Sequence, residues 1–232
     1  SDIAIGTAKL FGIRLKRNFA FPYFSRSIAE FWRRWHISLS SWFRDYLYIP
    51  LGGSRVGLLQ RIINTFIIFI VSGFWHGANW TFIFWGALNA LYFLPLLLLK
   101  RNRQHIEVVA KDRFLPSMTD FFKILLTFII TCFAWIFFRA NSLSSAFEYI
   151  SLLFSETIFY SPNFLALNKV YVLSVLIIGF LTLEWKGREA NYAIESFGES
   201  WPKSLKYIFY YCLAMIIFFF GGKEQAFIYF QF

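Results

Sequence analysis

Long runs of apolar residues, separated by short polar segments, dominate the chain after residue 61. They cover residues 62–74, 80–99, 121–138, 170–183 and 207–220. A helix rises about 1.5 Å per residue, so about 20 residues are needed to cross a hydrocarbon core of about 30 Å. The run 80–99 reaches that length alone, 121–138 and 170–183 reach it with their flanks, and 207–220 is marginal.

The run at 62–74 is followed closely by the run at 80–99, which predicts a helical hairpin over residues 62–99. Its first arm, residues 62–76, is too short to cross a bilayer and is expected to re-enter. The pattern therefore predicts an all-α, polytopic integral membrane protein with about four or five membrane-spanning or re-entrant helices.

Residues 27–48 have a different pattern, with period 3.6. Ser27 and Glu30 have the spacing of a capping box. We expect one amphipathic helix from Ser27 to Tyr48 that lies in the membrane interface. Aromatic residues and His36 share one face, and the charged residues, including Glu30, share the other. The apolar arc consists of Phe31, Trp32, Trp35, His36, Leu39, Trp42, Phe43, Tyr46 and Leu47, opposite Glu30, Arg33, Arg34, Arg44 and Asp45.

Composition supports a membrane protein. Hydrophobic residues make up 58% of the 232 residues, and charged residues only 16%, against about 25% charged in soluble domains. This excludes a disordered tail, a secreted disulfide scaffold and an ordinary cytosolic enzyme. The net charge is +10, but nucleic-acid-binding modules do not contain such long apolar runs. We therefore expect the lipid bilayer, and not nucleic acid, as the partner of the basic residues, with a multi-pass location in the inner cell membrane.

The basic residues also suggest an orientation. Residues 100–113 contain five, residues 139–163 contain only Arg139, and residues 186–206 contain four. The positive-inside rule then predicts that 100–113 and 186–206 are cytoplasmic and that 139–163 lies outside.

Few side chains are candidates for catalysis or metal binding. Cys132 and Cys212 lie in apolar stretches and have no disulfide or metal-site spacing, so no metal is expected. His105 lies in the basic loop and is interpreted as a solvated histidine. Two other histidines remain, without the partners of a serine-hydrolase triad or the acids of a metal site. They favour one or two imidazoles acting as general base and hydrogen-bond donor.

His76 follows the first arm of the hairpin and is expected at membrane depth. An ionisable residue there is a functional hypothesis by default. Gly73 and Gly77 flank it and permit close backbone approach or a break in the helix. The alternative is a neutral histidine in a polar cluster with Ser72 and Asn79.

His36 is the titratable side chain in the aromatic face of the segment 27–48. A histidine on an apolar face is often only a structural core residue, and this alternative stays open. Arg33, Arg34 and Arg44 on the opposite face are candidates to attract a phosphate-bearing donor or an anionic lipid, or simply form a solvated or lipid-contacting face.

Two long motifs resemble those of the membrane-bound O-acyltransferase family, in its bacterial alginate O-acetylation branch. The first is Glu30-Phe-Trp-Arg-Arg-Trp-His36 continuing through Arg44-Asp-Tyr-Leu-Tyr-Ile-Pro50-Leu-Gly-Gly53. The second is Phe74-Trp-His76-Gly-Ala-Asn79-Trp-Thr-Phe-Ile-Phe-Trp85-Gly86, and the terminal residues 227–232 are also typical of the branch.

The resemblance implies an enzyme that moves an acyl group, usually acetyl, from a cytoplasmic thioester such as acetyl-CoA to a hydroxyl delivered outside. It implies an essential catalytic role for His76 and a supporting catalytic role for His36. We expect Asn79, Trp35, Arg34 and Arg44 to bind substrate, no bound cofactor, a polysaccharide acceptor and a periplasmic or extracellular acetyltransferase as a partner. The implied fold is a ring of helices around a channel.

Members of the family are longer, and the resemblance begins within a motif around residues 2–6. We therefore expect residues 1–232 to be the C-terminal half of one such membrane domain, with a basic interfacial part (1–61), the hairpin (62–99) and further spanning helices (121–220). Two alternatives stay open: D-alanyl transfer to teichoic acid, favoured less by the motif at 44–53, and a non-catalytic truncated membrane fragment. A transporter is a weaker third.

Overall fold

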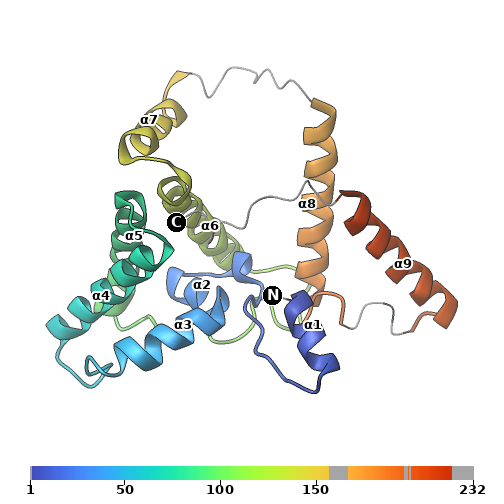
Figure 1. Cartoon of the computed structure of the whole chain (residues 1–232), viewed down its shortest axis with the longest axis horizontal. Helices are drawn as coiled ribbons and strands as arrows, with labels where there is room; N and C mark the ends of the chain where they lie inside the picture. The colour runs from blue at the N-terminus through green and yellow to red at the C-terminus, as the bar shows by residue number, and fades with distance from the viewer. Residues whose placement is uncertain (1, 157–166, 196–197, 199, 221–232) are drawn as a thin grey trace.

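The computed structural model describes residues 2–156, 167–195, 198 and 200–220, and every regular element in this part of the chain is helical (Figure 1). The long helices are α4 (Leu58–His76), α5 (Trp80–Leu98), α6 (Met118–Arg139), α8 (Leu167–Gly187) and α9 (Lys203–Phe220). The shorter elements are α1 (Asp2–Leu10), η1 (Pro22–Phe24), α2 (Ile28–Arg34), α3 (Ile37–Phe43), η2 (Arg44–Tyr48) and α7 (Leu143–Leu153). The family-typical residues 227–232 lie outside the described residues.

Four of these segments are long and apolar enough to cross a membrane: α4, α5, α6 and Val170–Gly187 of α8. This confirms the prediction of an all-α, multi-pass membrane protein. The prediction that the first arm is too short to cross is wrong, because α4 begins at Leu58 rather than residue 62 and is long enough to cross. Re-entry of this arm stays a prediction. α9, which contains the marginal run 207–220, is not among these four candidate spans of the described residues. The larger ring of helices stays a prediction.

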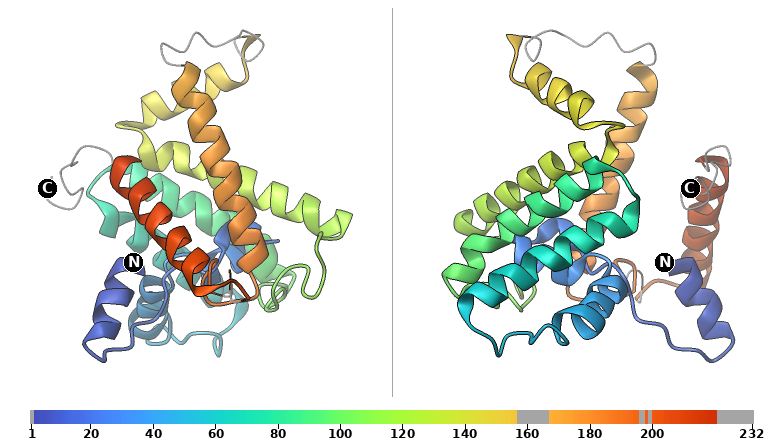
Figure 2. Two further views of the ribbon diagram at one scale, coloured as in Figure 1. Left: turned by 90° about the vertical axis from the view of Figure 1, so that its right-hand side faces the viewer. Right: turned by 60° about the vertical axis from the view of Figure 1, so that its left-hand side comes forward.

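In the region predicted to form a hairpin, residues 62–99, α4 and α5 lie side by side, with α6 packed against α5 (Figure 2). Two glycines bring the hairpin backbones together. A Cβ on Gly73 would overlap the carbonyl oxygen of Phe82, and one on Gly86 would overlap that of Phe69. Small residues at such contacts let membrane helices pack closely. Gly77, with φ of +152°, then ends α4 in a conformation that few other residues adopt.

The prediction of a single interfacial helix from Ser27 to Tyr48 is wrong. The structure divides it into α2, α3 and the π-helical turn η2, with a break at Trp35 and His36. His36 has a left-handed backbone, with φ of +44°. Asn18 fills the break, because its carbonyl oxygen accepts from the Ile37 N–H at 2.9 Å and its side-chain oxygen accepts from the Ser38 N–H at 3.0 Å. A helical wheel drawn across this break fails for part of the segment: Trp42 and Tyr46 of the predicted apolar arc are exposed, and Glu30 is buried.

Glu30 is the clearest example, since the wheel placed it on the polar face and the structure buries it completely. Its carboxylate forms ion pairs with Arg26 at 3.1 Å and with Arg34 at 2.8 Å. The two guanidinium groups also donate to the carbonyl oxygen of Glu107, at 2.7 and 3.2 Å. We call Arg26, Glu30 and Arg34 the buried triad. It connects α2 to the basic loop that follows α5.

Other hydrogen bonds place the basic loops together. Arg33 donates to the carbonyl oxygens of Asn102 and Gln104, both at 2.7 Å, and Arg188 donates to that of Val109 at 2.9 Å. The loop after α5 and the residues after α8 therefore lie on one side, and the 22-residue α6 separates them from Arg139. This confirms the predicted relative placement of these segments. Which side is cytoplasmic stays a prediction.

The segment after α6 contains a helix that was not predicted. α7 begins with a capping box in which the side chains of Ser142 and Ser145 each accept from the other's backbone N–H. Its buried Ala146 packs with Trp85, Ala134 and Phe137, so α5, α6 and α7 share an apolar core.

Replacing Glu30 by Gln should strongly destabilise the protein, because two largely buried guanidinium groups would lose their counter-charge. Removal of one partner of a buried ion pair costs about 3–5 kcal/mol. We expect a clearly lower unfolding temperature in detergent micelles. Glu148→Gln, a change at an exposed residue of α7, is the matched control and should unfold as the native protein does. Equal unfolding temperatures for both variants would contradict this role of the triad.

Candidate active site

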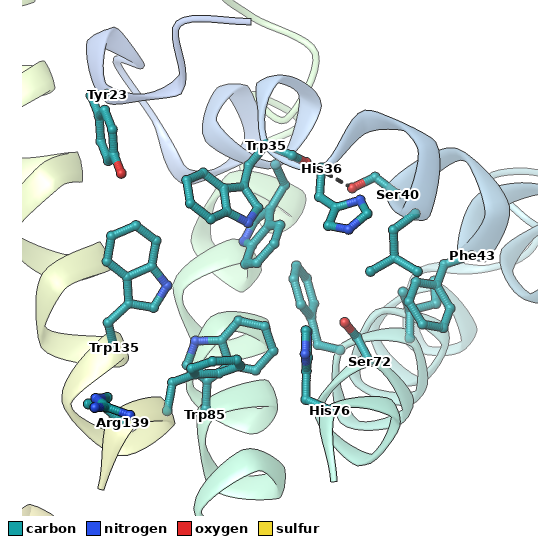
Figure 3. Close-up of a pocket in the computed structure, with 15 residues that line it drawn as sticks. Tyr23, Trp35, His36, Ser40, Phe43, Ser72, His76, Trp85, Trp135 and Arg139 are labelled. Carbon is teal, nitrogen blue, oxygen red and sulfur yellow. Dashed lines mark hydrogen bonds between the residues drawn. The ribbon is translucent and has the colours of Figure 1, made fainter. Parts of the chain in front are cut away.

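A cavity of about 600 Å³ lies between the break at His36 and helices α4, α5 and α6 (Figure 3). Both candidate histidines line it, His36 from one side and His76 from the other. We call it the histidine cavity. The rest of its wall is mostly aromatic and apolar: Tyr23, Trp32, Trp35, Leu39, Ser40, Phe43, Ile68, Phe69, Ser72, Trp85, Trp135, Phe138 and Arg139.

His76 is the last residue of α4 and is packed among aromatic rings. Its imidazole lies edge-on to Phe138, with 4.9 Å between ring centroids, and to Trp85, at 5.5 Å. Its ring makes no hydrogen bond with any other described residue. The alternative of a polar cluster with Asn79 is therefore not realised as hydrogen bonds. Asn79 instead caps α5, accepting from the Thr81 N–H at 3.0 Å, and donates to the carbonyl oxygen of Asn141 at 3.3 Å.

His36 enters the cavity because of its unusual backbone. A left-handed conformation is uncommon for a residue other than glycine, and such strain often accompanies a functional site. The Nδ1 atom is buried and has no hydrogen-bond partner among the described residues, whereas Nε2 is not buried in this way. Burial lowers the pKa of His36 from its usual value near 6.5. The ring is therefore neutral at pH 7, with Nε2 as the nitrogen open to a substrate.

Trp35, which the sequence suggested as a substrate-binding residue, forms part of the cavity wall. Its indole stacks on Phe31 with 5.4 Å between ring centroids and an interplanar angle of 17°. The ring centroid of Trp35 also lies 5.1 Å from that of Trp135 on α6 and 4.8 Å from that of Phe19. These contacts hold an apolar wall around the two imidazoles, and such a wall excludes water and strengthens electrostatic interactions inside it.

A second cavity, of about 560 Å³, adjoins the histidine cavity and shares Ser40, Ile68 and Phe69 with it. Four basic residues line this basic cavity: Arg44, Arg61, Lys100 and Arg103. The Nε of Arg61 is buried without a hydrogen-bond partner in the described chain. Arg44 is exposed and pairs with Asp45 at 2.7 Å. Such a cluster suits the phosphates of an anionic ligand.

Sequence reasoning missed three of these residues, Arg61, Lys100 and Arg103. Arg61 precedes the first apolar run and Lys100 follows the second, so the two arms of a hairpin carry them to the same membrane face. That spacing was the available signal. By contrast, Arg33 and Arg34 line neither cavity: Arg34 belongs to the buried triad, and Arg33 binds loop carbonyls.

A third cavity, of about 510 Å³, lies between α6 and α7 and shares Trp135 and Arg139 with the histidine cavity. We call it the α6–α7 cavity. Its other lining residues are Cys132, Ile136, Ala140, Asn141, Ser145, Ala146 and Tyr149. The histidine cavity thus has a basic neighbour on the side of the basic loops and another neighbour at the far end of α6.

The sequence model of the membrane-bound O-acyltransferase family matches residues 1–140. The chain belongs to the membrane-bound O-acyltransferase family. The matched residues include both histidines, the whole lining of the histidine cavity and the basic cavity.

Individual relatives carry related activities in their names. A protein named probable alginate O-acetylase, from Pseudomonas aeruginosa, is 37% identical over 196 residues, which are 83% of this chain and 35% of the relative. A peptidoglycan O-acetyltransferase of Helicobacter pylori is 44% identical over 63% of this chain and 26% of its own length. A teichoic acid D-alanyltransferase of Bacillus subtilis is 31% identical over 60% of this chain and 36% of its own.

The chain thus spans about a third of the length of the curated relatives that it matches. Placing residues 1–232 in the C-terminal half of one membrane-bound O-acyltransferase domain stays a prediction.

The chemistry available in the histidine cavity is that of two imidazoles within a mostly aromatic and apolar lining. A neutral imidazole positioned near a hydroxyl accepts its proton. No group of three or more His, Cys, Asp or Glu residues suited to a metal ion is found in the described residues.

Proposed function

We propose that the protein transfers an acetyl group from a cytoplasmic thioester to a hydroxyl of an exported or cell-surface polysaccharide, at the inner membrane. The observation that carries this proposal is that one cavity holds both His36 and His76 and adjoins a basic cavity on one side and the α6–α7 cavity on the other. The family and the named O-acetyltransferase relatives support the reaction class.

In the proposed reaction His76 is the general base. Its imidazole takes the proton of the acceptor hydroxyl as the oxygen attacks the thioester carbonyl carbon. The tetrahedral intermediate then collapses, the carbon–sulfur bond breaks, and the thiolate leaves with the proton that His76 returns. An ester and a free thiol result. His36, through Nε2, is proposed to hydrogen-bond the donor or the acceptor across the cavity.

The basic cavity is the proposed site for the phosphate-bearing end of the donor, with acetyl-CoA as the leading candidate. Arg44 and Arg61 would bind phosphate, and the shared wall residues Ile68 and Phe69 would direct the thioester arm toward the imidazoles. Arg34 would act indirectly, because its guanidinium already pairs with Glu30. Trp35 would contact the acyl group as part of the apolar wall.

The acceptor is proposed to enter from the other side, past Asn79 and Asn141, which join α5 to the segment after α6. This side faces out of the cell in the orientation predicted from the basic loops. A separate periplasmic or extracellular acetyltransferase that receives the acetyl group is a second proposed partner there.

D-alanyl transfer toward teichoic acid is the second candidate, since the Bacillus subtilis relative with that name covers 60% of the chain. Its identity of 31% is lower than that of the O-acetyltransferase relatives, at 37% and 44%. Mass spectrometry of the group transferred to the polymer separates acetyl from D-alanyl directly.

Replacing His76 by Gln in the intact protein should reduce the acetyl ester content of the surface polysaccharide to background, because the proton acceptor is lost. His105→Gln is the matched control, since His105 lines none of the three cavities and its loss should leave the ester content unchanged. Unchanged ester in His76→Gln at equal expression would defeat the catalytic assignment and favour the non-catalytic alternative.

Replacing Arg61 by Gln should raise the KM for acetyl-CoA about tenfold, the effect of losing one charge-assisted contact to phosphate. The KM for acetyl-pantetheine, which has the thioester but no phosphate, should stay unchanged. Arg55→Gln, at an exposed arginine outside the basic cavity, is the control. Equal losses with both donors would show that Arg61 supports the fold and not the phosphates.

A further inference from the structure

We propose that Arg139 forms a subsite for an oxyanion on the acceptor, a carboxylate or a phosphate, so that the enzyme selects acidic glycans. This inference rests on the proposed function and names the class of its acceptor. It assigns a specificity role to the residue shared by the histidine cavity and the α6–α7 cavity.

The position of Arg139 is the first observation. It is the last residue of α6, and its side chain lines both cavities. Figure 3 shows it beside Trp135, at the end of the histidine cavity away from His36. The side chain is exposed, and its guanidinium forms no ion pair or hydrogen bond with another described residue. Its donors are therefore available to a ligand.

The second observation is the scarcity of charge around it. Arg139 is the only basic residue in the segment 139–163, where the positive-inside rule disfavours cations. No acidic side chain belongs to the described lining of either cavity. A guanidinium without a counter-charge in the described lining suits an oxyanion that accepts two hydrogen bonds, a carboxylate or a phosphate.

The third observation is the position of Arg139 relative to His76. Phe138, which precedes Arg139, packs edge-on against the imidazole of His76 at 4.9 Å between ring centroids. Arg139 and His76 line the same cavity, so an anion bound by Arg139 would hold the acceptor in the cavity that contains the proposed general base. Trp135, one turn earlier on α6, offers an aromatic surface to a sugar ring, and Asn141 and Tyr149 add polar groups that suit sugar hydroxyls.

Binding tests the subsite independently of catalysis. The intact protein in nanodiscs is titrated with three fluorescent probes: an oligosaccharide of uronic acids, the same oligosaccharide with its carboxyl groups reduced to alcohols, and a glycerol-phosphate oligomer. We expect the uronate or the phosphate probe to bind about tenfold more tightly than the neutral one. Whichever anionic probe binds identifies the oxyanion. Equal affinity for all three would overturn the proposal.

Variants connect the preference to Arg139. Arg139→Gln should abolish it, Arg139→Lys should keep part of it, and Arg113→Gln, at an exposed arginine outside all three cavities, should leave it unchanged. The affinity of the native protein for the anionic probe should fall as salt is raised, and that of Arg139→Gln should not. A preference or salt dependence that survives in folded Arg139→Gln would refute the assignment.

His76→Gln separates this inference from the proposed function. It should bind the anionic probe as the native protein does but transfer no acetyl group. If the native protein binds the probe selectively through Arg139 yet acetylates no carbohydrate, the proposed function fails and the anion subsite stands.

Discussion

The burial of one carboxylate is the constraint on which the site depends. Glu30 is excluded from water, and a buried charge is tolerated only with counter-charges and hydrogen bonds. Arg26 and Arg34 supply both, and each also donates to the carbonyl oxygen of Glu107 in the loop after α5. The same network thus holds α2, which leads to His36, and the loop, which carries Lys100 and Arg103 to the basic cavity.

The arrangement of the three cavities follows from this network and from the hairpin. The glycine contacts between α4 and α5 bring His76 against Trp85, and the break between α2 and α3 turns His36 toward it. A donor approaching from the basic loops and an acceptor approaching past Arg139 would meet between the two imidazoles. Separating the two substrates in this way suits a reaction that joins a cytoplasmic donor to an exported acceptor.

The sequence allowed the apolar helices, the hairpin and the two histidines to be predicted, because bilayer crossing and intramembrane charge impose strong local patterns. The break at His36 was not predictable from periodicity, since Asn18, which stabilises it, lies well before the helix. The burial of Glu30 depends in the same way on loop carbonyls distant in the chain. The basic cavity was missed because its lining comes from α3, η2, α4, α5 and the loops that follow η2 and α5.

The central claim is that His36 and His76 act together on one reaction. A double-mutant cycle on kcat for acetyl transfer tests it, using His36→Gln, His76→Gln and the combined variant. Residues that act as a unit show strongly non-additive losses, so the combined variant should lose about as much activity as His76→Gln alone. A combined loss equal to the product of the two single losses would show that the imidazoles act independently, and would contradict the account.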